Sequence, residues 1–215
     1  MFSASELVGL TCESVKSENN DDLAYLAATG KMELSIRDSL GALITRKFPN
    51  LTAAREYQRR DLVILGDGHP LAIIEGKFWI SFEANFPSKL HNPNPNEGLI
   101  AASRSDILKM NDLHLSSGCK RFISTVLFAA DIRQLEARHL PAVKYPNWHR
   151  RGLADGSDLM TTHSLGVTSF LEATRPFGPG TTRRLFEGRV YGMTVVADVV
   201  ICEVTCSVAS LKTVT

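Results

Sequence analysis

The chain has 215 residues, of which 44% are hydrophobic and 22% charged, the composition of an ordinary globular domain. Its 24 Lys and Arg residues nearly balance 23 Asp and Glu residues, which leaves a formal net charge of +1. This balance excludes a histone-like protein that neutralises nucleic acid with its whole surface, and it excludes an acidic disordered tail. A local basic surface remains compatible with it. We expect one domain over residues 1–215, which can fold without a metal or disulfide staple.

Targeting and redox features point to an ordinary intracellular protein. The N-terminal segment MFSASELVGL lacks a basic leader followed by an apolar run, so we expect no secretory signal. The longest apolar tract, Val195 to Ile201, contains Asp198 and is far shorter than the roughly 18 residues of a membrane helix. The four cysteines form no CxxC pair, and we expect reduced thiols that pack as small hydrophobes. We therefore expect a soluble, cytoplasmic protein with no membrane partner.

Three helices are predicted in the first 50 residues. Ser3 and Glu6 have the spacing of a capping box that begins the first helix. A short second helix, Leu23 to Thr29, follows Asp21 or Asp22 and ends at Gly30. A third runs from about Lys31 to Lys47, before Pro49.

The hydrophobic period then changes to that of strands. Glu56 to Leu65 and Leu71 to Phe82 are rich in β-branched and aromatic residues, and Gly66-Asp67-Gly68-His69 between them is a strong hairpin signal. Further along we expect a loop at Pro87–Glu97, a helix at Leu99–Leu115, a buried strand at Arg121–Ala130, a short helix at Asp131–His139, a helix from a Ser157 cap to about Thr174, and strands at Arg189–Val196 and Val199–Cys206. This order predicts an α/β (α+β) domain with a central mixed sheet flanked by helices.

The hairpin brings charged residues together. Side chains alternate along a strand, so Glu75 and Lys77 share one face. A turn centred on Asp67 and Gly68 places Asp61 opposite Ile74, within one residue of Glu75. Because cross-strand neighbours lie about 5 Å apart, we expect the two carboxylates and the ammonium to converge.

A third acid comes from the helix before the hairpin. Glu33 shares a helical face with Ile36, Leu40 and Leu43, the face expected to dock on the sheet. A carboxylate on a buried face is costly unless it is paired or metal-bound. Arg37, one turn further on, is the alternative partner.

Three carboxylates and a lysine aimed at one point suit Mg²⁺-assisted phosphodiester hydrolysis. Mg²⁺ binds through one or two carboxylates and keeps several waters. It lowers the pKa of a bound water and neutralises charge in the transition state. A nearby ammonium can orient that water or stabilise the same charge.

These residues resemble a known family. Glu33 with IRDSL, then RRDLVI, then IIEGK are similar to the PD-(D/E)XK nuclease superfamily, whose restriction-endonuclease-like core would cover about residues 30–135. The resemblance implies that Asp61 and Glu75 bind the metal, with Gly76 offering its carbonyl. It further implies that Lys77 is the catalytic lysine and Glu33 the helical acid. The sequence departs from the motif at Arg60, where the family has proline.

The resemblance implies a Mg²⁺-dependent DNA endonuclease, in which Mn²⁺ would substitute. It would be a type II-like restriction enzyme or another defence or repair nuclease. Restriction enzymes of this size usually act as homodimers. Two alternatives stay open: a catalytically inactive nucleic-acid- or protein-binding module of the same fold, and an unrelated interaction module. In the latter, Asp61 and Glu75 would pair with Lys77 or Arg59 on a solvated face.

Two segments outside this core mix cations with aromatic or glycine residues. One is Lys144 to Arg151 and the other is Arg175 to Arg189, both within the part (140–215) expected to complete the sheet and contact substrate. Cations suit phosphates, and rings suit stacking on bases. The predicted nucleic-acid-binding residues are Lys144, Tyr145, Trp148, Arg150, Arg151, Arg183 and Arg184.

Overall fold

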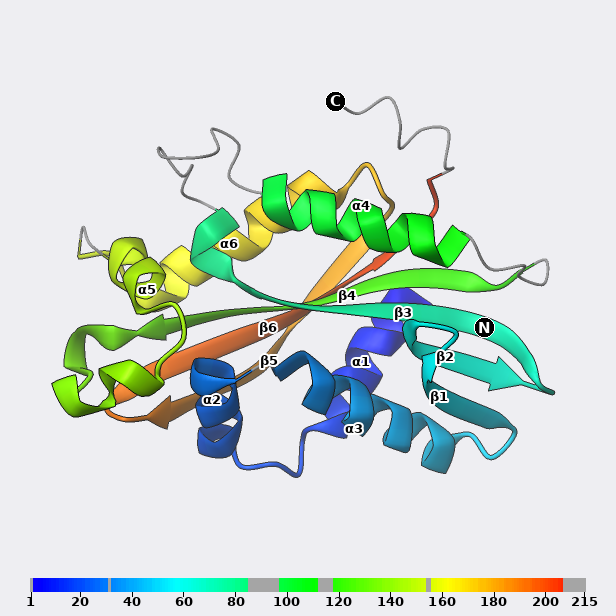
Figure 1. Cartoon of the computed structure of the whole chain (residues 1–215), viewed down its shortest axis with the longest axis horizontal. Helices are drawn as coiled ribbons and strands as arrows, with labels where there is room; N and C mark the ends of the chain where they lie inside the picture. The colour runs from blue at the N-terminus through cyan, green and yellow to red at the C-terminus, as the bar shows by residue number, and fades with distance from the viewer. Residues whose placement is uncertain (1, 31, 85–96, 112–117, 154–155, 207–215) are drawn as a thin grey trace.

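A six-stranded mixed sheet forms the centre of the computed structural model (Figure 1). The structure describes residues 2–30, 32–84, 97–111, 118–153 and 156–206. The strands lie in the order β1-β2-β3-β4-β6-β5, with β3 and β4 parallel and the other neighbours antiparallel. Their bounds are β1 Leu51–Tyr57, β2 Arg60–Gly66, β3 His69–Ile80, β4 Lys120–Asp131, β5 Gly180–Val190 and β6 Met193–Glu203.

Helices cover both faces of the sheet. The helices α4 and α6 lie on one face, and α1, α2 and α3 lie on the other (Figure 1). The bounds are α1 Ala4–Ser14, α2 Asn20–Thr29, α3 Met32–Lys47, α4 Glu97–Asn111, α5 Pro146–Gly152 and α6 Leu159–Thr174, with 3₁₀ segments η1 Ser81–Ala84, η2 Ile132–Gln134 and η3 Ala137–Ala142. Within the described residues no helix is both long and apolar enough to cross a bilayer.

Side-chain alternation along the strands separates the core into two layers. Leu62 packs with Leu40 of α3 on one side of the sheet. Its neighbour Val63 packs with Ile107 of α4 on the other side. Each side of the sheet carries an apolar cluster, so these strands are buried on two faces, as expected for a sheet covered by helices on both sides.

The first strand predicted from the sequence is wrong in its bounds. In place of one strand at Glu56–Leu65, β1 and β2 form a hairpin in which Tyr57 pairs with Arg60. The turn residues Gln58 and Arg59 have φ values of 49° and 67°. Gln-Arg has no glycine, asparagine or aspartate to mark a left-handed turn, which is why the pattern concealed it.

The second hairpin forms at the predicted turn, but its register differs by one residue further along. Gly66 pairs with His69 and Leu65 with Pro70, the register that would bring Asp61 opposite Ile74. A bulge between Ile64 and Leu65 then shifts the ladder, so that Leu62, and not Asp61, pairs with Ile74. The shift continues toward Asp61 and brings it level with Glu75. Bulges re-aim side chains in this way beside many active sites.

The last two strands also differ from the prediction. The chain turns at Tyr191 and Gly192, with φ values of 52° and 82°, and not near Asp198. Asp198 lies within β6, where its carboxylate pairs with Arg184 and lies 3.4 Å from Nε2 of His163. This partly buried ion pair allows an acid inside a strand, where composition alone suggests a break.

The helical predictions need smaller corrections. Helix α5 was not predicted, the short helix at Asp131–His139 is two 3₁₀ segments, and Asp158 caps α6 in place of Ser157. The capping box of Ser3 and Glu6 forms as predicted. The cysteines are free thiols. Residues 87–96 of the predicted loop and the end of the helix predicted to Leu115 lie outside the described residues.

Candidate active site

The candidate site lies where β3 extends beyond its neighbour. Pairing between β2 and β3 is recorded as far as Ile74, whereas pairing between β3 and β4 continues to Ile80. Over Glu75–Ile80, the edge of β3 that faces away from β4 is therefore unpaired within the described part of the sheet. Such an edge carries backbone groups that need other partners.

Asp61 supplies one of these partners. Its Oδ2 accepts a hydrogen bond of 2.7 Å from the backbone N–H of Gly76. Because the N–H and C=O of one strand residue point to the same edge, the Gly76 carbonyl also faces the Asp61 side. The predicted metal-binding triplet of two carboxylates and a carbonyl thus gathers at this edge.

A cavity of about 620 Å³ opens around the free edge. It reaches both faces of the sheet, since α3 contributes Glu33 from one side and α4 contributes Asp106 from the other. All five residues predicted for the catalytic and metal site line it. Its lining comprises Glu33, Arg59, Asp61, Glu75, Gly76, Lys77, Phe78, Trp79, Ile80, Ala102, Asp106, Lys109, Lys144 and Tyr145.

Glu75 lies deep in the cavity, with 3% of its surface exposed. Within the described part of the chain its Oε1 accepts no hydrogen bond, and the nearest cationic atom recorded is Nε of Arg60 at 4.0 Å. Burial, together with the negative charges of Asp61 and Asp106, raises the pKa of Glu75 from 4.5 to about 8. The side chain is therefore mostly protonated at neutral pH.

Lys77 has a partner that the sequence did not suggest. Its ammonium pairs with the carboxylate of Asp106, which is 2% exposed, on α4. Lys109 binds the same carboxylate, with Nζ 2.8 Å from Oδ1. The hydrogen bond and charge of Asp106 raise the pKa of Lys109. The predicted catalytic lysine is thus held toward α4 by a buried acid.

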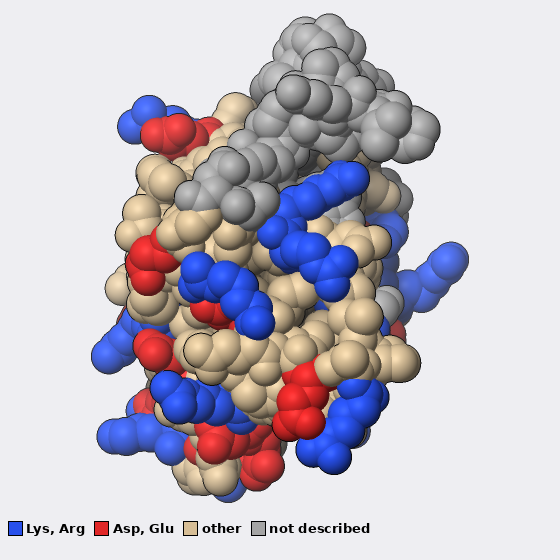
Figure 2. Space-filling view, turned by 90° about the vertical axis from the view of Figure 1, so that its left-hand side faces the viewer, with Lys and Arg blue, Asp and Glu red and all other residues tan. Residues whose placement is uncertain are grey.

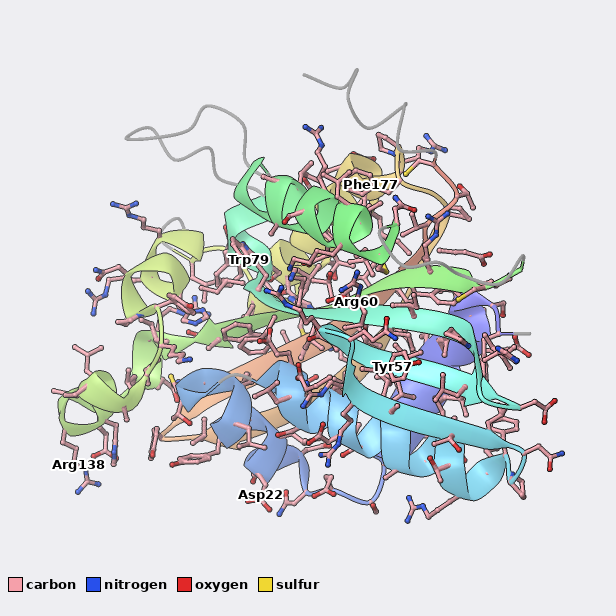
Figure 3. All side chains as sticks on the ribbon, turned by 45° about the vertical axis from the view of Figure 1, so that its right-hand side comes forward. Asp22, Tyr57, Arg60, Trp79, Arg138 and Phe177 are labelled. Carbon is pink, nitrogen blue, oxygen red and sulfur yellow. The ribbon has the colours of Figure 1, made fainter. Side chains whose placement is uncertain are left out.

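Arg60 links the same helix to the strands. It is 7% exposed and lies between α4 and the sheet in Figure 3. Its guanidinium donates to the carbonyl oxygens of Gln58, at 2.9 Å, and of Lys109. Arg60 therefore ties α4 to the turn between β1 and β2, next to Glu75.

Glu33 does not form the ion pair offered as its alternative. Arg37 pairs instead with its neighbour Asp38 and with Glu56 of β1. Glu33 is half-buried and lines both the main cavity and a small pocket beneath it that Asp61 shares. Its position near the start of α3 thus places a third carboxylate on the cavity wall.

The residues predicted to bind nucleic acid divide into two groups. Lys144 and Tyr145 line the cavity, and Arg150 and Arg151 are exposed on the adjoining helix α5. Figure 2 shows that side of the molecule, with Lys and Arg side chains spread across it and acidic ones between them.

The other group lies away from the cavity. Arg183 and Arg184 belong to β5, the opposite edge strand, separated from β3 by β4 and β6. Arg184 is also engaged in the ion pair with Asp198. The side chain of Trp148 lies outside the described residues.

The donor set fits a hard divalent cation. No group of three or more His, Cys, Asp or Glu side chains close enough to hold a metal is found among the described residues. Mg²⁺ does not require one, because it binds through one or two carboxylates and retains waters. Asp61, Glu75 and the Gly76 carbonyl supply that number, and the unpartnered Oε1 of Glu75 is a free ligand atom.

Sequence reasoning missed Asp106 and Lys109, and it considered Arg59 only as an ion-pair partner of the two hairpin acids. Asp106 was detectable, because it continues the α4 face of Ser103, Ile107 and Met110, all of which are buried. An acid on an apolar helical face is the same signal that identified Glu33. Arg59 and Lys109 carry no such signal, since exposed cations are common.

Comparison with known proteins does not identify this chain. No family model, no curated protein and no solved structure matches it.

Proposed function

We propose that this protein is a Mg²⁺-dependent endonuclease that hydrolyses phosphodiester bonds in DNA, with a restriction-endonuclease-like arrangement of its core. The observation that supports the proposal is the cavity at the free edge of β3. It collects Asp61, Glu75, Gly76 and Lys77 from two strands and Glu33 from a helix. Mn²⁺ is expected to substitute for Mg²⁺.

Each residue has a role that follows from its place. Asp61 and Glu75, with the Gly76 carbonyl, would hold the cation, and the cation would supply a water of lowered pKa and neutralise charge on the phosphate. Glu75 must release its proton to become a ligand. Lys77 offers a cation to the phosphate or the attacking water, and Asp106 fixes its direction. Glu33, which lines the same cavity, would accept a hydrogen bond from a metal-bound water.

The test is incubation of the protein with supercoiled, linear and single-stranded DNA in Mg²⁺, with the products resolved on a gel. We expect cleavage that EDTA stops and Mn²⁺ restores. Discrete bands would indicate sequence specificity, and a smear would indicate none. Absence of cleavage on every substrate, in either metal, would overturn the proposal.

A matched pair of variants ties the activity to the site. Asp61→Asn keeps an oxygen that can accept the Gly76 hydrogen bond but loses the charge of a ligand. Asp67→Asn makes the same chemical change at the exposed turn of the same hairpin, where asparagine tolerates the left-handed backbone. Cleavage should disappear in the first variant and persist in the second.

A further inference from the structure

The cavity has an aromatic and cationic side that metal-dependent hydrolysis does not by itself require. Tyr145 lies there with 51% of its surface exposed, an unusual state for a large ring at a cavity wall. Trp79 and Phe78 continue the lining from β3, and both are half-buried. The cations Lys109 and Lys144 line the same cavity.

The backbone holds Tyr145 in a conformation that disfavours its side chain. Its φ and ψ are 55° and 42°, in the left-handed region, and Pro146 follows it. Residues other than glycine, asparagine and aspartate rarely adopt this conformation, and such strain concentrates at functional sites. Packing nearby does not require the ring, since about half of it faces solvent.

Neighbouring elements fix this strained residue firmly. The N–H of Lys144 donates to the Ala28 carbonyl of α2 at 2.7 Å, and the N–H of His149 donates to the Tyr145 carbonyl at 3.3 Å. His149 is fully buried and accepts a 3.3 Å hydrogen bond from the N–H of Ala130 on β4. The ring is therefore presented by a segment anchored to both a helix and a central strand.

The depth of the acids limits what can reach them. Glu75 and Asp106 are almost completely buried between β3 and α4, so a phosphate must enter the cavity to approach them. A cavity of about 620 Å³ has the size of a site for one small molecule. A single unpaired nucleotide can enter a cavity of this size, whereas a base within a duplex must first be unpaired and unstacked to enter it.

Resting on the proposed nuclease function, we propose that the cavity admits a single unpaired nucleotide and that Tyr145 stacks on its base. The preferred substrate is then single-stranded DNA, or the unpaired end or flap of a duplex. Lys144 and Lys109 would neutralise the flanking phosphates. Stacking on a ring is tolerant of base identity, so this recognition selects strand state and not sequence.

The test is binding of a fluorescent DNA oligonucleotide in EDTA, where hydrolysis does not occur. The same strand is measured alone and annealed to its complement, at one fixed low salt concentration. The wild-type protein should bind the single strand more tightly than the duplex. Tyr145→Ala, which meets the same backbone strain, should weaken single-strand binding by about 5- to 150-fold. Its duplex binding should change little.

Two variants separate the ring from other causes. Tyr145→Phe keeps the stacking surface and should bind as the wild type does. Tyr25→Ala removes a ring that is 47% exposed on α2 and does not line the cavity, and it should also have no effect. Loss of binding in the phenylalanine variant would show that the hydroxyl, and not the ring, recognises the DNA, and it would overturn the proposal.

The outcomes distinguish this inference from the nuclease function. If Tyr145→Ala selectively loses single-strand binding but the wild-type protein cleaves no DNA in Mg²⁺, the stacking role is supported and the nuclease function is refuted. Cleavage of duplex DNA with single-strand binding unchanged in Tyr145→Ala would support the enzyme and refute the stacking role. A wild-type protein that binds no oligonucleotide, or binds the duplex better, would also refute it.

Discussion

Replacement of Glu75 by glutamine should stabilise the metal-free protein increasingly as the pH rises. In the folded protein the pKa of Glu75 is about 8, against 4.5 for the ordinary side chain. Between these values the folded chain keeps a proton that the unfolded chain has lost, so stability falls as the pH rises through this window. Below pH 4.5 Glu75 is protonated in both the folded and the unfolded chain, so its burial carries no charge penalty and its contribution to the stability of the folded state is greatest there. Glutamine has no proton to lose and removes the dependence.

The size of the effect follows from the pKa values and the setting of the residue. Each pKa unit is equivalent to about 1.4 kcal/mol, so the rise to about 8 sets an upper limit of about 5 kcal/mol. The pKa of about 8 already reflects the positive charges of Lys77 and Lys109. The cavity is open to water, which screens part of the remaining effect. We expect about 2–3 kcal/mol of additional stability for Glu75→Gln at pH 9 relative to pH 5, after that screening.

The assay is urea unfolding of the wild type and the variant in EDTA, at intervals from pH 5 to pH 9. Glu18→Gln, at an exposed position before α2, provides the control for loss of one negative charge. The difference between Glu75→Gln and wild type should grow with pH, and that of the control should stay flat. A pH-independent difference, or a variant less stable than wild type at pH 9, would refute the reasoning. Adding Mg²⁺ should reduce the wild-type loss of stability at high pH, because binding stabilises the folded state.

Three further substitutions test the other members of the site, each by cleavage rates with the melting temperature as a check on folding. Lys77→Ala should lose most activity yet keep its stabilisation by Mg²⁺, because the ammonium acts on the water or phosphate; loss of metal stabilisation would contradict this role. Asp106→Asn should also lower the rate, by releasing Lys77, and should cost about 1–2 kcal/mol of stability since both lysines retain contact with water; an unchanged rate would exclude a positioning role. Glu33→Gln should reduce the rate less than Asp61→Asn does, and a normal rate would remove Glu33 from the site.

The local signals in the sequence predicted the hairpin well but not its far end. Asp67-Gly68 forms a left-handed turn because those residues tolerate positive φ, and the sequence therefore predicts this turn. The sequence does not predict the bulge beside Leu65, since the bulge depends on how the strands pack against the rest of the sheet. The prediction therefore placed Asp61 and Glu75 close together, as the structure does, but with a strand register that is wrong by one residue.

Long-range pairing accounts for the other errors. Asp198 looked like a strand break because its partners, Arg184 and His163, come from other elements. Asp106 has a local signal on its helical face, but the charge that it binds, Lys77, lies on a strand distant in sequence. Composition and period describe a residue's own segment, and a buried charge is explained only by the segment opposite it.

The two acids of the hairpin, Asp61 and Glu75, have different surroundings although they lie level with each other on adjacent strands. Asp61 sits at the edge itself, where a backbone N–H satisfies one of its oxygens. Glu75, level with it on the next strand, points under α4 into a layer where burial and two other carboxylates oppose its charge. Retention of a proton by Glu75 follows from this burial. If a divalent cation binds both, its charge must offset the cost of ionising Glu75, so binding releases a proton and strengthens as the pH rises. In that case the burial that destabilises the metal-free protein at high pH would also make the affinity for the cation rise with pH.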